Sequence, residues 1–451
     1  MEENNKITVI PDETTQAENI SDSLTEQKHS HHSHHHHSHH SHRRKHKRRT
    51  SNSAGKKLKN FFKRYKSIII NILSCTVSVV LLILLAAKKD TPTNNDVKLP
   101  EVQTITESTV KIETSVYPEK VRLISDAIAH YLDPSNNSTA LESYRAYYGY
   151  TGGLDAGRPV TFVYRASGLP AGTSVEGASL DVSESSTYED ARTYDLGTDT
   201  NELEIFNLKT GTKYYYRLNI HLSNGCDVGA TGSFETEATP RVLNIDGLVN
   251  VRDIGGWETT DGKTIRQGLI YRGCELDGAV EPSYCLTDTG FLQMTNDLGI
   301  RFDLDLRPST DNKDGKDALG HGAIHKYYNS PMYSDILRDD GPEVIRNIFS
   351  ELAKAENYPI YIHCTYGRDR TGTVCYLLEA MLGVSDADLY RDYELSAFTD
   401  SYVNYAEFDT FVERIRSLEG DNTKERVENW LLSIGVSAKE LESIREILLE
   451  E

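Results

Sequence analysis

Cys364 and Arg370 are the two residues whose types and spacing most directly suggest chemistry. They stand in residues 359–372, PIYIHCTYGRDRTG, which reads as a short apolar strand, a tight loop and a helix that begins near Thr371. A thiolate is a nucleophile, and a loop at a helix N-terminus surrounds it with backbone N–H groups and the positive end of the helix dipole. The same N–H groups can cradle phosphate oxygens, and the planar guanidinium of Arg370 can bind two of them. The pattern indicates phosphoryl transfer.

The residues around this pair receive supporting roles. Gly367 lets the backbone turn tightly, and the Thr371 hydroxyl can stabilise the thiolate when it leaves. The predicted substrate-binding set is His363, Thr365, Tyr366, Gly367, Arg368, Arg252 and Arg272. Two alternatives stay open. His363 is equally well a buried histidine with satisfied hydrogen bonds, and Arg252, Asp253 and Arg272 are equally well buried ion pairs that hold the loop.

The loop HCTYGRDRTG resembles the HCxxGxxR[ST]G signature of the protein-tyrosine phosphatase superfamily. It is most similar to the branch of secreted bacterial tyrosine and phosphoinositide phosphatases, whose loop reads HCxxGKDRTG. Four further segments resemble that branch in the same order along the chain: NVRDIGG at 250–256, LIYRGCEL at 269–276, LGIRFDLDLR at 298–307 and DYELS at 392–396. Arg368 departs from the usual Lys of the branch; it keeps the charge but differs in geometry.

The resemblance implies two-step covalent catalysis, in which Cys364 forms a phosphocysteine that water then hydrolyses. It leaves three candidates for the general acid. Asp369 stands inside the loop, Asp335 lies where tyrosine phosphatases carry a mobile acid loop, and Asp305 is more simply a structural residue. The expected substrates are phosphorylated proteins, with phosphoinositides or small phosphomonoesters as alternatives. A catalytically silent binding protein is the alternative from another class, although Cys364, Asp369, Arg370 and Thr371 are all present. No cofactor and no metal is predicted.

Charge is unevenly distributed over the 451 residues, whose net charge is −19. Residues 1–87 carry 14 basic and 7 acidic side chains, and the rest of the chain carries 35 basic and 61 acidic ones. Such an acidic chain argues against nucleic acid as a partner, because binding requires neutralisation of phosphates. The six cysteines are sparse and contain no CxxC pair, which argues against a disulfide framework or a zinc site.

The N-terminal part predicts a tail and a membrane anchor. Residues 1–66 are polar and include a histidine-rich tract between His29 and His46, so we expect a disordered basic tail. Residues 67–87, SIIINILSCTVSVVLLILLAA, carry no charge and would span about 30 Å as a helix. The basic residues lie on their N-terminal side, so the positive-inside rule predicts a single-pass type II protein of the cell membrane with an extracytoplasmic catalytic domain.

The remaining chain predicts a stalk and two folded domains. Residues 88–134 read as a stalk with a short helix over 119–132. Residues 135–240 contain short alternating runs separated by turns, which favour an antiparallel β-sandwich. There the segment from Leu208 to Tyr214, LKTGTKY, resembles the tyrosine corner of fibronectin type III domains. Strands and helices alternate in residues 241–451, which predicts an α/β layer domain. The expected fold class is therefore multidomain: tail, transmembrane helix, fibronectin III-like sandwich and α/β cysteine-phosphatase domain.

Overall fold

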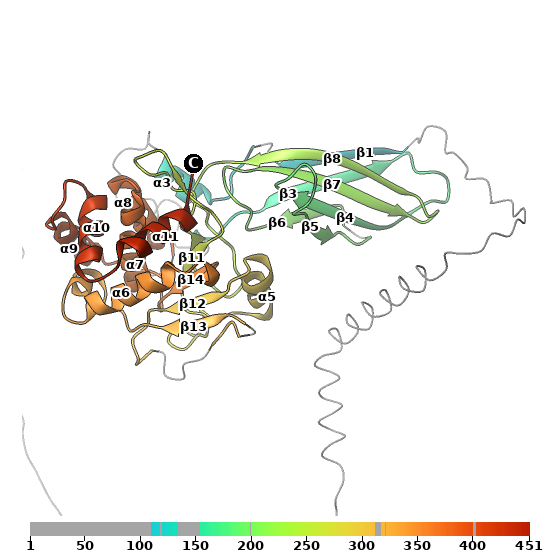
Figure 1. The fold of residues 1–451 in the computed structure, drawn as a ribbon. Coiled ribbons are helices and arrows are strands. Elements are labelled where there is room, and N and C mark those ends of the chain that lie inside the picture. Colours follow the sequence, from blue (N-terminus) through green and yellow to red (C-terminus); the bar gives the residue numbers. More distant parts are fainter. Residues whose placement is uncertain are drawn as a thin grey trace, which may run out of the picture. The chain divides into compact units, whose positions relative to one another are not determined.

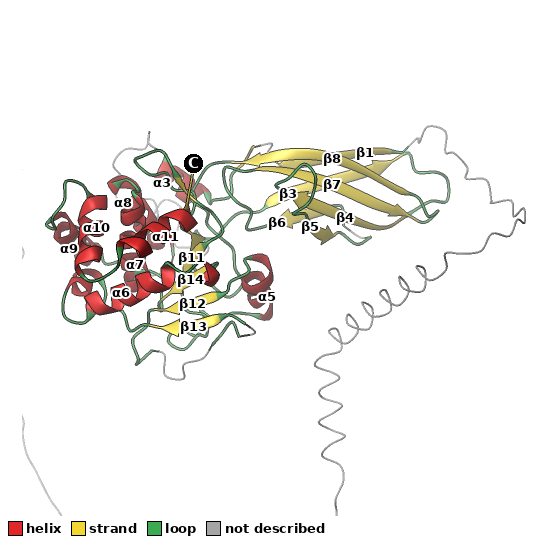
Figure 2. Ribbon diagram, viewed as in Figure 1, coloured by secondary structure: helices red, strands yellow, loops and turns green. Residues whose placement is uncertain are grey.

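The computed structural model describes residues 110–117, 120–133, 135, 154–198, 200–311, 317–320, 322–399 and 403–451. All of them belong to one compact unit, Gln103–Glu451. Within it, strands dominate residues 111–236 and helices dominate the C-terminal part (Figure 2).

Two β-sheets form the first part of the described chain (Figure 1). One has the order β1 (Lys111–Tyr117), β3 (Val160–Ser167) and β6 (Glu202–Ile205), all antiparallel. The other has the order β2 (Lys120–Val121), β8 (Asp227–Thr236), β7 (Lys213–Leu222), β4 (Val175–Ser183) and β5 (Arg192–Asp195). It is antiparallel except where β2 runs parallel to β8.

A single apolar core contains side chains from both sheets. We call the pair of sheets the β-sandwich. Along β7, every second side chain is buried, from Tyr214 to Leu222, as the alternating sequence predicts. Phe162 of the first sheet meets Tyr216 of the second in an edge-to-face contact, with ring centroids 5.1 Å apart. Because β1 pairs with β3 along its whole length, residues that the sequence placed in the stalk are part of this sandwich.

The predicted short helix is also shorter and more deeply integrated than the sequence suggested. It is α3 (Asp126–Leu132), which begins after a Ser125 cap. Its Ala127 and Ile128 join the core of the C-terminal domain, and Tyr131 contacts Phe398 of that domain with ring centroids 5.6 Å apart. The segment before the sandwich therefore helps to build the domain after it.

The C-terminal domain is built on a five-stranded sheet. Its order is β13 (Ile324–Tyr327), β12 (Phe302–Asp305), β14 (Ile360–His363), β11 (Ile270–Gly273) and β9 (Arg252–Asp253). The pairs are parallel apart from β9 with β11. The short strands β10 (Thr264–Ile265) and β15 (Leu449–Glu450) pair separately. This is the α/β layer domain that the sequence predicts for residues 241–451.

Helices cover both faces of this sheet. The principal helices are α6 (Gly341–Leu352), α7 (Asp369–Leu382), α8 (Asp386–Leu395), α9 (Tyr405–Arg416), α10 (Thr423–Ser433) and α11 (Ala438–Leu448). α5 (Asp288–Leu292) and the π-helical turn η1 (Gln293–Asp297) lie on the other face (Figure 1). Short 3-10 turns are η2 (Tyr333–Leu337), η3 (Ala355–Asn357) and η4 (Ser396–Phe398). Along β14, Ile360 and Ile362 join one core and Tyr361 joins the other, so both faces are buried.

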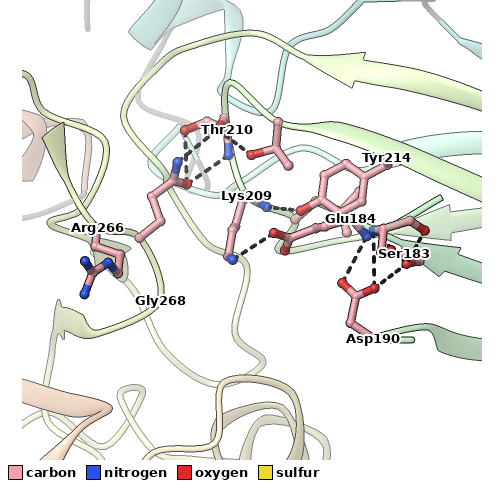
Figure 3. Close-up of polar contacts among 12 residues, drawn as sticks. Ser183, Glu184, Asp190, Lys209, Thr210, Tyr214, Arg266 and Gly268 are labelled. Carbon is pink, nitrogen blue, oxygen red and sulfur yellow. Dashed lines mark hydrogen bonds and ion pairs between the residues drawn. The ribbon is translucent and has the colours of Figure 1, made fainter. Parts of the chain in front are cut away.

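The sandwich meets the C-terminal domain through hydrogen bonds around Arg241. This buried guanidinium donates to the carbonyls of Asn207 (2.7 Å) and Leu208 (3.2 Å) and to the carboxylate of Asp253 (2.7 Å). Nearby, Thr210 N donates to Gln267 Oε1 at 3.0 Å, and Lys209 pairs with Glu184 at 3.0 Å (Figure 3). The Tyr214 hydroxyl accepts a hydrogen bond from Lys209 N at 2.9 Å in the same turn.

The membrane-anchored part of the predicted fold class requires correction. No helix among the described residues is long and apolar enough to cross a membrane. The longest of them, α7, has 14 residues, which at ~1.5 Å each falls well short of the ~30 Å of a bilayer core. Residues 67–87, where the anchor was predicted, lie outside the described residues. The predicted transmembrane anchor and single-pass type II location are therefore not retained.

Candidate active site

Cys364 lies where the central strand of the sheet gives way to a helix. β14 ends at His363 and α7 begins at Asp369, two residues earlier than the sequence suggested. The residues between, Cys364 to Arg368, form a loop that enters a 14-residue helix at its N-terminus. Cys364 is 2% exposed, so the thiol lies at the bottom of the loop. This is the strand–loop–helix order that the spacing predicts.

Arg370 is fixed in the first turn of α7. It is half-buried, and its Nε donates to the carbonyl of Ser330 at 3.1 Å. Anchoring the guanidinium through Nε restricts the side chain to a narrow range of orientations. Thr371, the next residue, is fully buried, and its hydroxyl has no hydrogen-bond partner among the described residues. Leaving a buried hydroxyl without a hydrogen bond costs folding free energy, so its presence calls for a reason. This hydroxyl remains available to bind a ligand or the Cys364 thiolate.

Gly367 can be only a glycine in this loop. Its φ of +66° lies in the left-handed region, and an added Cβ would collide with the carbonyl of Gly273 at the end of β11. The loop carbonyls beside it are all bonded. Thr365 O accepts from Glu275 N at 3.0 Å, Tyr366 O accepts from Asn250 Nδ2 at 3.0 Å, and Gly367 O accepts from Asn250 Nδ2 at 3.1 Å.

Asp369 is held by two neighbours. The hydroxyl of Tyr333 donates to Asp369 Oδ1, and Arg368 Nη2 lies 3.1 Å from Asp369 Oδ2. Tyr333 in turn contacts the hydroxyl of Tyr393 at 2.9 Å. Arg368 also stacks over the ring of Tyr366, with 5.0 Å from its guanidinium carbon to the ring centroid.

The other two acid candidates occupy different surroundings. Asp335 has an exposed side chain paired with Arg338, on the turn η2. Asp305 is fully buried and accepts three hydrogen bonds from the Arg307 guanidinium, at 2.8 to 3.1 Å. Burial raises the pKa of Asp305, but His363 and Arg307 together bring it below its usual value. A carboxylate kept ionised in this way suits the structural role that the sequence already favoured for it.

His363 lies beneath the loop as half of a buried ion pair. Its Nε2 is 2.9 Å from Asp303 Oδ1, and both side chains are almost completely buried. Burial alone would lower the pKa of His363, but Asp303 and Asp305 raise it to about 9. At neutral pH the imidazole is therefore cationic, and in the interior it is paired with Asp303.

Arg252 and Arg272 form ion pairs in the interior. Arg252 Nε donates to Asp392 Oδ1 at 2.9 Å, and Arg272 pairs with the other oxygen of the same carboxylate. Arg252 is 2% exposed and Arg272 is 0% exposed. Arg272 Nη2 continues to the carbonyl of Gly367 at 3.0 Å. For Arg252 and Arg272 the sequence left open a role in substrate binding and a role as buried ion pairs that hold the loop. This geometry favours the ion pairs.

A cavity of about 560 Å³ opens beside the loop. It is lined by Arg368 and Asp369, by Asp335 of η2 and the flanking residues Met332 and Arg338, and by α9 residues that include Glu407 and Arg414. Elsewhere in the described chain, donor atoms of Asp303, Asp317 and His325 lie within 4.8 Å of one another and could approach a metal ion. Asp303 is already engaged by His363, however, so that cluster belongs first to the ion pair.

Sequence reasoning missed several residues that the structure brings to the loop. Asn250, Ser330, Tyr333 and Asp392 all contact the loop, the start of α7 or the arginines that hold it. Asn250 and Asp392 carried a signal, because they open two of the motifs that resemble the phosphatase branch, NVRDIGG and DYELS. The others lie in stretches whose residue types alone suggest turns or surface helices.

The geometry of this loop agrees with comparisons to known proteins. Residues 243–450 match the model of the tyrosine phosphatase family. The match extends over the C-terminal domain, just under half of the chain. A Cupriavidus necator protein named as a tyrosine-protein phosphatase, H16_A0669, is 26% identical over 175 residues, covering 34% of this chain and 61% of that protein. A tyrosine-protein phosphatase of Nostoc commune is 25% identical over 122 residues, covering 22% and 41%.

These matches support a phosphatase enzyme. The matched segments extend over only part of each relative. The chain spans 61% and 41% of the lengths of those two curated relatives. Among solved structures, the core catalytic domain of the PP-IP phosphatase SIW14 from S. cerevisiae in complex with citrate is 17% identical. It covers 36% of this chain and 89% of that one, with a TM-score of 0.23, a likeness too low to carry an argument about fold or substrate.

Proposed function

We propose that the C-terminal domain hydrolyses phosphomonoesters through a phosphocysteine on Cys364. The observation that carries this proposal is the path of the chain from β14 through Cys364 into α7, with Arg370 anchored to Ser330 O in the first turn. A helix N-terminus offers N–H groups to an anion, and a fixed arginine adds bidentate binding. The family match and the phosphatase names of the relatives support the same reaction class.

In the proposed mechanism, the Cys364 thiolate attacks phosphorus and the bond from phosphorus to the leaving oxygen breaks. The acid form of Asp369 gives its proton to that oxygen. Water then attacks the phosphocysteine, its proton passes to Asp369, and the bond between sulfur and phosphorus breaks to release phosphate. Arg370 and the loop N–H groups stabilise the charge on the equatorial oxygens in both steps. Asp369 is placed ahead of Asp335 because it directly follows the loop as the first residue of α7, whereas Asp335 is exposed and paired with Arg338.

The cavity beside the loop supports a phosphorylated protein as substrate rather than a polyphosphorylated inositol. Among the charged residues that line it, Arg338, Arg368 and Arg414 are matched by Asp335, Asp369 and Glu407. Two of these arginines are already paired, Arg338 with Asp335 and Arg368 with Asp369. A groove balanced in this way gives no field that would gather several phosphates. It suits a peptide of mixed charge, with Met332 available for apolar contact.

We also propose that the β-sandwich is fibronectin type III-like and acts as a docked support. The hydrogen bond from Lys209 N to the Tyr214 hydroxyl supports a tyrosine corner. The contacts of Arg241 support docking, because this buried side chain holds two carbonyls of the sandwich and one carboxylate of the C-terminal domain.

The decisive experiment compares the full chain with its Cys364→Ser variant in the hydrolysis of para-nitrophenyl phosphate. We expect the variant to lose turnover while it still binds inorganic tungstate, an oxoanion with the shape of phosphate. Turnover that survives in Cys364→Ser rejects the mechanism. The substrate class is then tested with phosphotyrosine peptides, phosphoserine peptides and phosphoinositides on the wild-type chain. A kcat/KM that is highest for phosphoinositides contradicts the choice of protein substrates.

A further inference from the structure

Three consecutive backbone carbonyls of the loop that carries Cys364 accept hydrogen bonds from other parts of the protein. The backbone of Glu275 holds Thr365 O, and Asn250 Nδ2 holds both Tyr366 O and Gly367 O, at 3.0 and 3.1 Å. Arg272 Nη2 donates to Gly367 O as well, at 3.0 Å. Buried backbone carbonyls require hydrogen-bond partners, and here Glu275, Asn250 and Arg272 supply them.

The orientation of a carbonyl determines the orientation of the amide that follows it. A peptide group is planar and trans, so its C=O and its N–H point in opposite directions. Holding Tyr366 O and Gly367 O toward Asn250 therefore turns the N–H groups of Gly367 and Arg368 to the opposite side of the loop. Successive N–H groups that share one side of a turn form an anion-binding concavity.

The position of Asn250 is itself determined by its neighbours. Its φ is +58°, a left-handed conformation that asparagine tolerates better than most residues, and its backbone N–H donates to Asp155 at 2.6 Å. Arg252 Nη1 donates to Asn250 Oδ1 at 2.6 Å. Because an arginine faces the carbonyl end of the side chain, the amide end, Nδ2, is the end that faces the loop.

We infer that Asn250 is a positioning residue of the active site, which acts by turning the amides of Gly367 and Arg368 toward the bound phosphate. This inference rests on the proposed phosphatase function for its consequence in turnover, but not for its consequence in anion binding. Asn250 touches no reacting atom. It fixes the anion-binding geometry through the loop carbonyls, with Arg272 as a second support at Gly367.

Asn250→Gly in the full chain tests the inference, because glycine adopts a positive φ without strain and removes only the side chain. Asn207→Gly is the matched control. Asn207 also has a positive φ, of +65°, and also makes side-chain hydrogen bonds to backbone, with Asn244 at 2.7 and 3.0 Å, but it lies in the sandwich. Asn250→Asp is a second variant, which keeps the size of the side chain and removes its donor.

Three measurements are made on each variant: tungstate affinity by calorimetry, kcat/KM for para-nitrophenyl phosphate, and alkylation of the Cys364 peptide by iodoacetamide at pH 7. For Asn250→Gly we expect tungstate affinity to fall about tenfold or more and kcat/KM to fall about 100-fold, the scale of one lost oxyanion donor. Slower alkylation of Cys364 should accompany both. Asn207→Gly should match the wild type in all three.

The outcomes separate this inference from the proposed function. A wild type that binds tungstate without hydrolysing phosphate, together with weakened binding in Asn250→Gly, upholds the inference and rejects the phosphatase proposal. Unchanged tungstate affinity in a folded Asn250→Gly or Asn250→Asp variant overturns the inference, as do equal losses in Asn207→Gly. If near-UV circular dichroism shows that neither Asn250 variant folds, the residue supports the fold rather than the loop, and the inference is wrong.

Discussion

The imidazole Nε2 of His363 lies 2.9 Å from a carboxylate oxygen of Asp303 in the interior, one residue before Cys364 in the chain. This ion pair joins β14 to its neighbour β12, and so the strand that delivers Cys364 is held by charge as well as by its backbone ladder. A buried charge is tolerated only with a partner, and each of these residues supplies it to the other.

This pair makes the stability of the fold depend on pH on the alkaline side. The pKa of His363 is about 9, above the value of about 6.5 for a free histidine. The stabilisation is therefore complete below pH ~6.5 and is lost as pH rises through 9, with an upper size of about 3 kcal/mol. Urea unfolding from pH 6 to 10 should show this decline in the wild type and a smaller one in Asp303→Asn. Asp227→Asn, which removes the carboxylate from an exposed pair with His221, is the control and should keep the wild-type profile.

The general acid can be distinguished by the leaving group of the substrate. Phenyl phosphate needs protonation of its leaving oxygen far more than para-nitrophenyl phosphate does. We expect Asp369→Asn to lower kcat on phenyl phosphate about 100-fold or more, the scale of general acid catalysis, with a smaller loss on the nitrophenyl ester. Asp335→Asn is the matched variant. Its kcat should stay within about twofold of the wild-type value on both substrates, because the exposed ion pair with Arg338 contributes little to stability. The opposite ranking of the two variants would assign the acid to Asp335.

Gly367 provides a test of loop packing. Gly367→Ala places a methyl group against Gly273 O in a backbone with positive φ, so both collision and strain oppose it. We expect a loss of about 2–4 kcal/mol in unfolding free energy and loss of tungstate binding. Gly197→Ala is the control, because its φ is +61° and nothing lies within 4 Å of an added Cβ. It should cost only about 1–2 kcal/mol and leave tungstate binding intact. Equal behaviour of the two variants would show that the loop can yield at Gly367.

The sequence predicted those parts of the site that depend on local order. Cys364, Gly367 and Arg370 lie within seven residues, so strand, loop and helix could be assigned from hydrophobic pattern and residue type, and the α/β layer domain followed from the alternation of elements. Asn250 could not be given its role, since it meets Tyr366 and Gly367 across more than a hundred residues. The same holds for α3, whose short apolar face gave no sign that its partner was the C-terminal core. Long-range partners depend on topology, which residue spacing does not encode.

The junction around Arg241 offers the last test, because both tryptophans of the chain, Trp257 and Trp430, lie in the C-terminal domain. Tryptophan fluorescence therefore follows the unfolding of that domain, whereas far-UV circular dichroism follows both parts. Arg241→Ala removes the clamp on Asn207 O and Leu208 O and leaves the buried Asp253 without its cation. We expect the unfolding free energy to fall by about 3–5 kcal/mol, and the two probes to report two separate urea transitions in place of one.

Arg192→Ala is the matched change at the same junction. Arg192 pairs with Asp297 across it at 2.8 Å, but the arginine side chain is 47% exposed. An exposed ion pair of this kind contributes about 0–1 kcal/mol to stability. Tryptophan fluorescence and circular dichroism should therefore still report a single unfolding transition. Coincident transitions in Arg241→Ala would mean that the sandwich stays docked without the clamp. Its support would then come from the apolar packing of α3 against the C-terminal core, since Ala127 and Ile128 contact that core independently of Arg241.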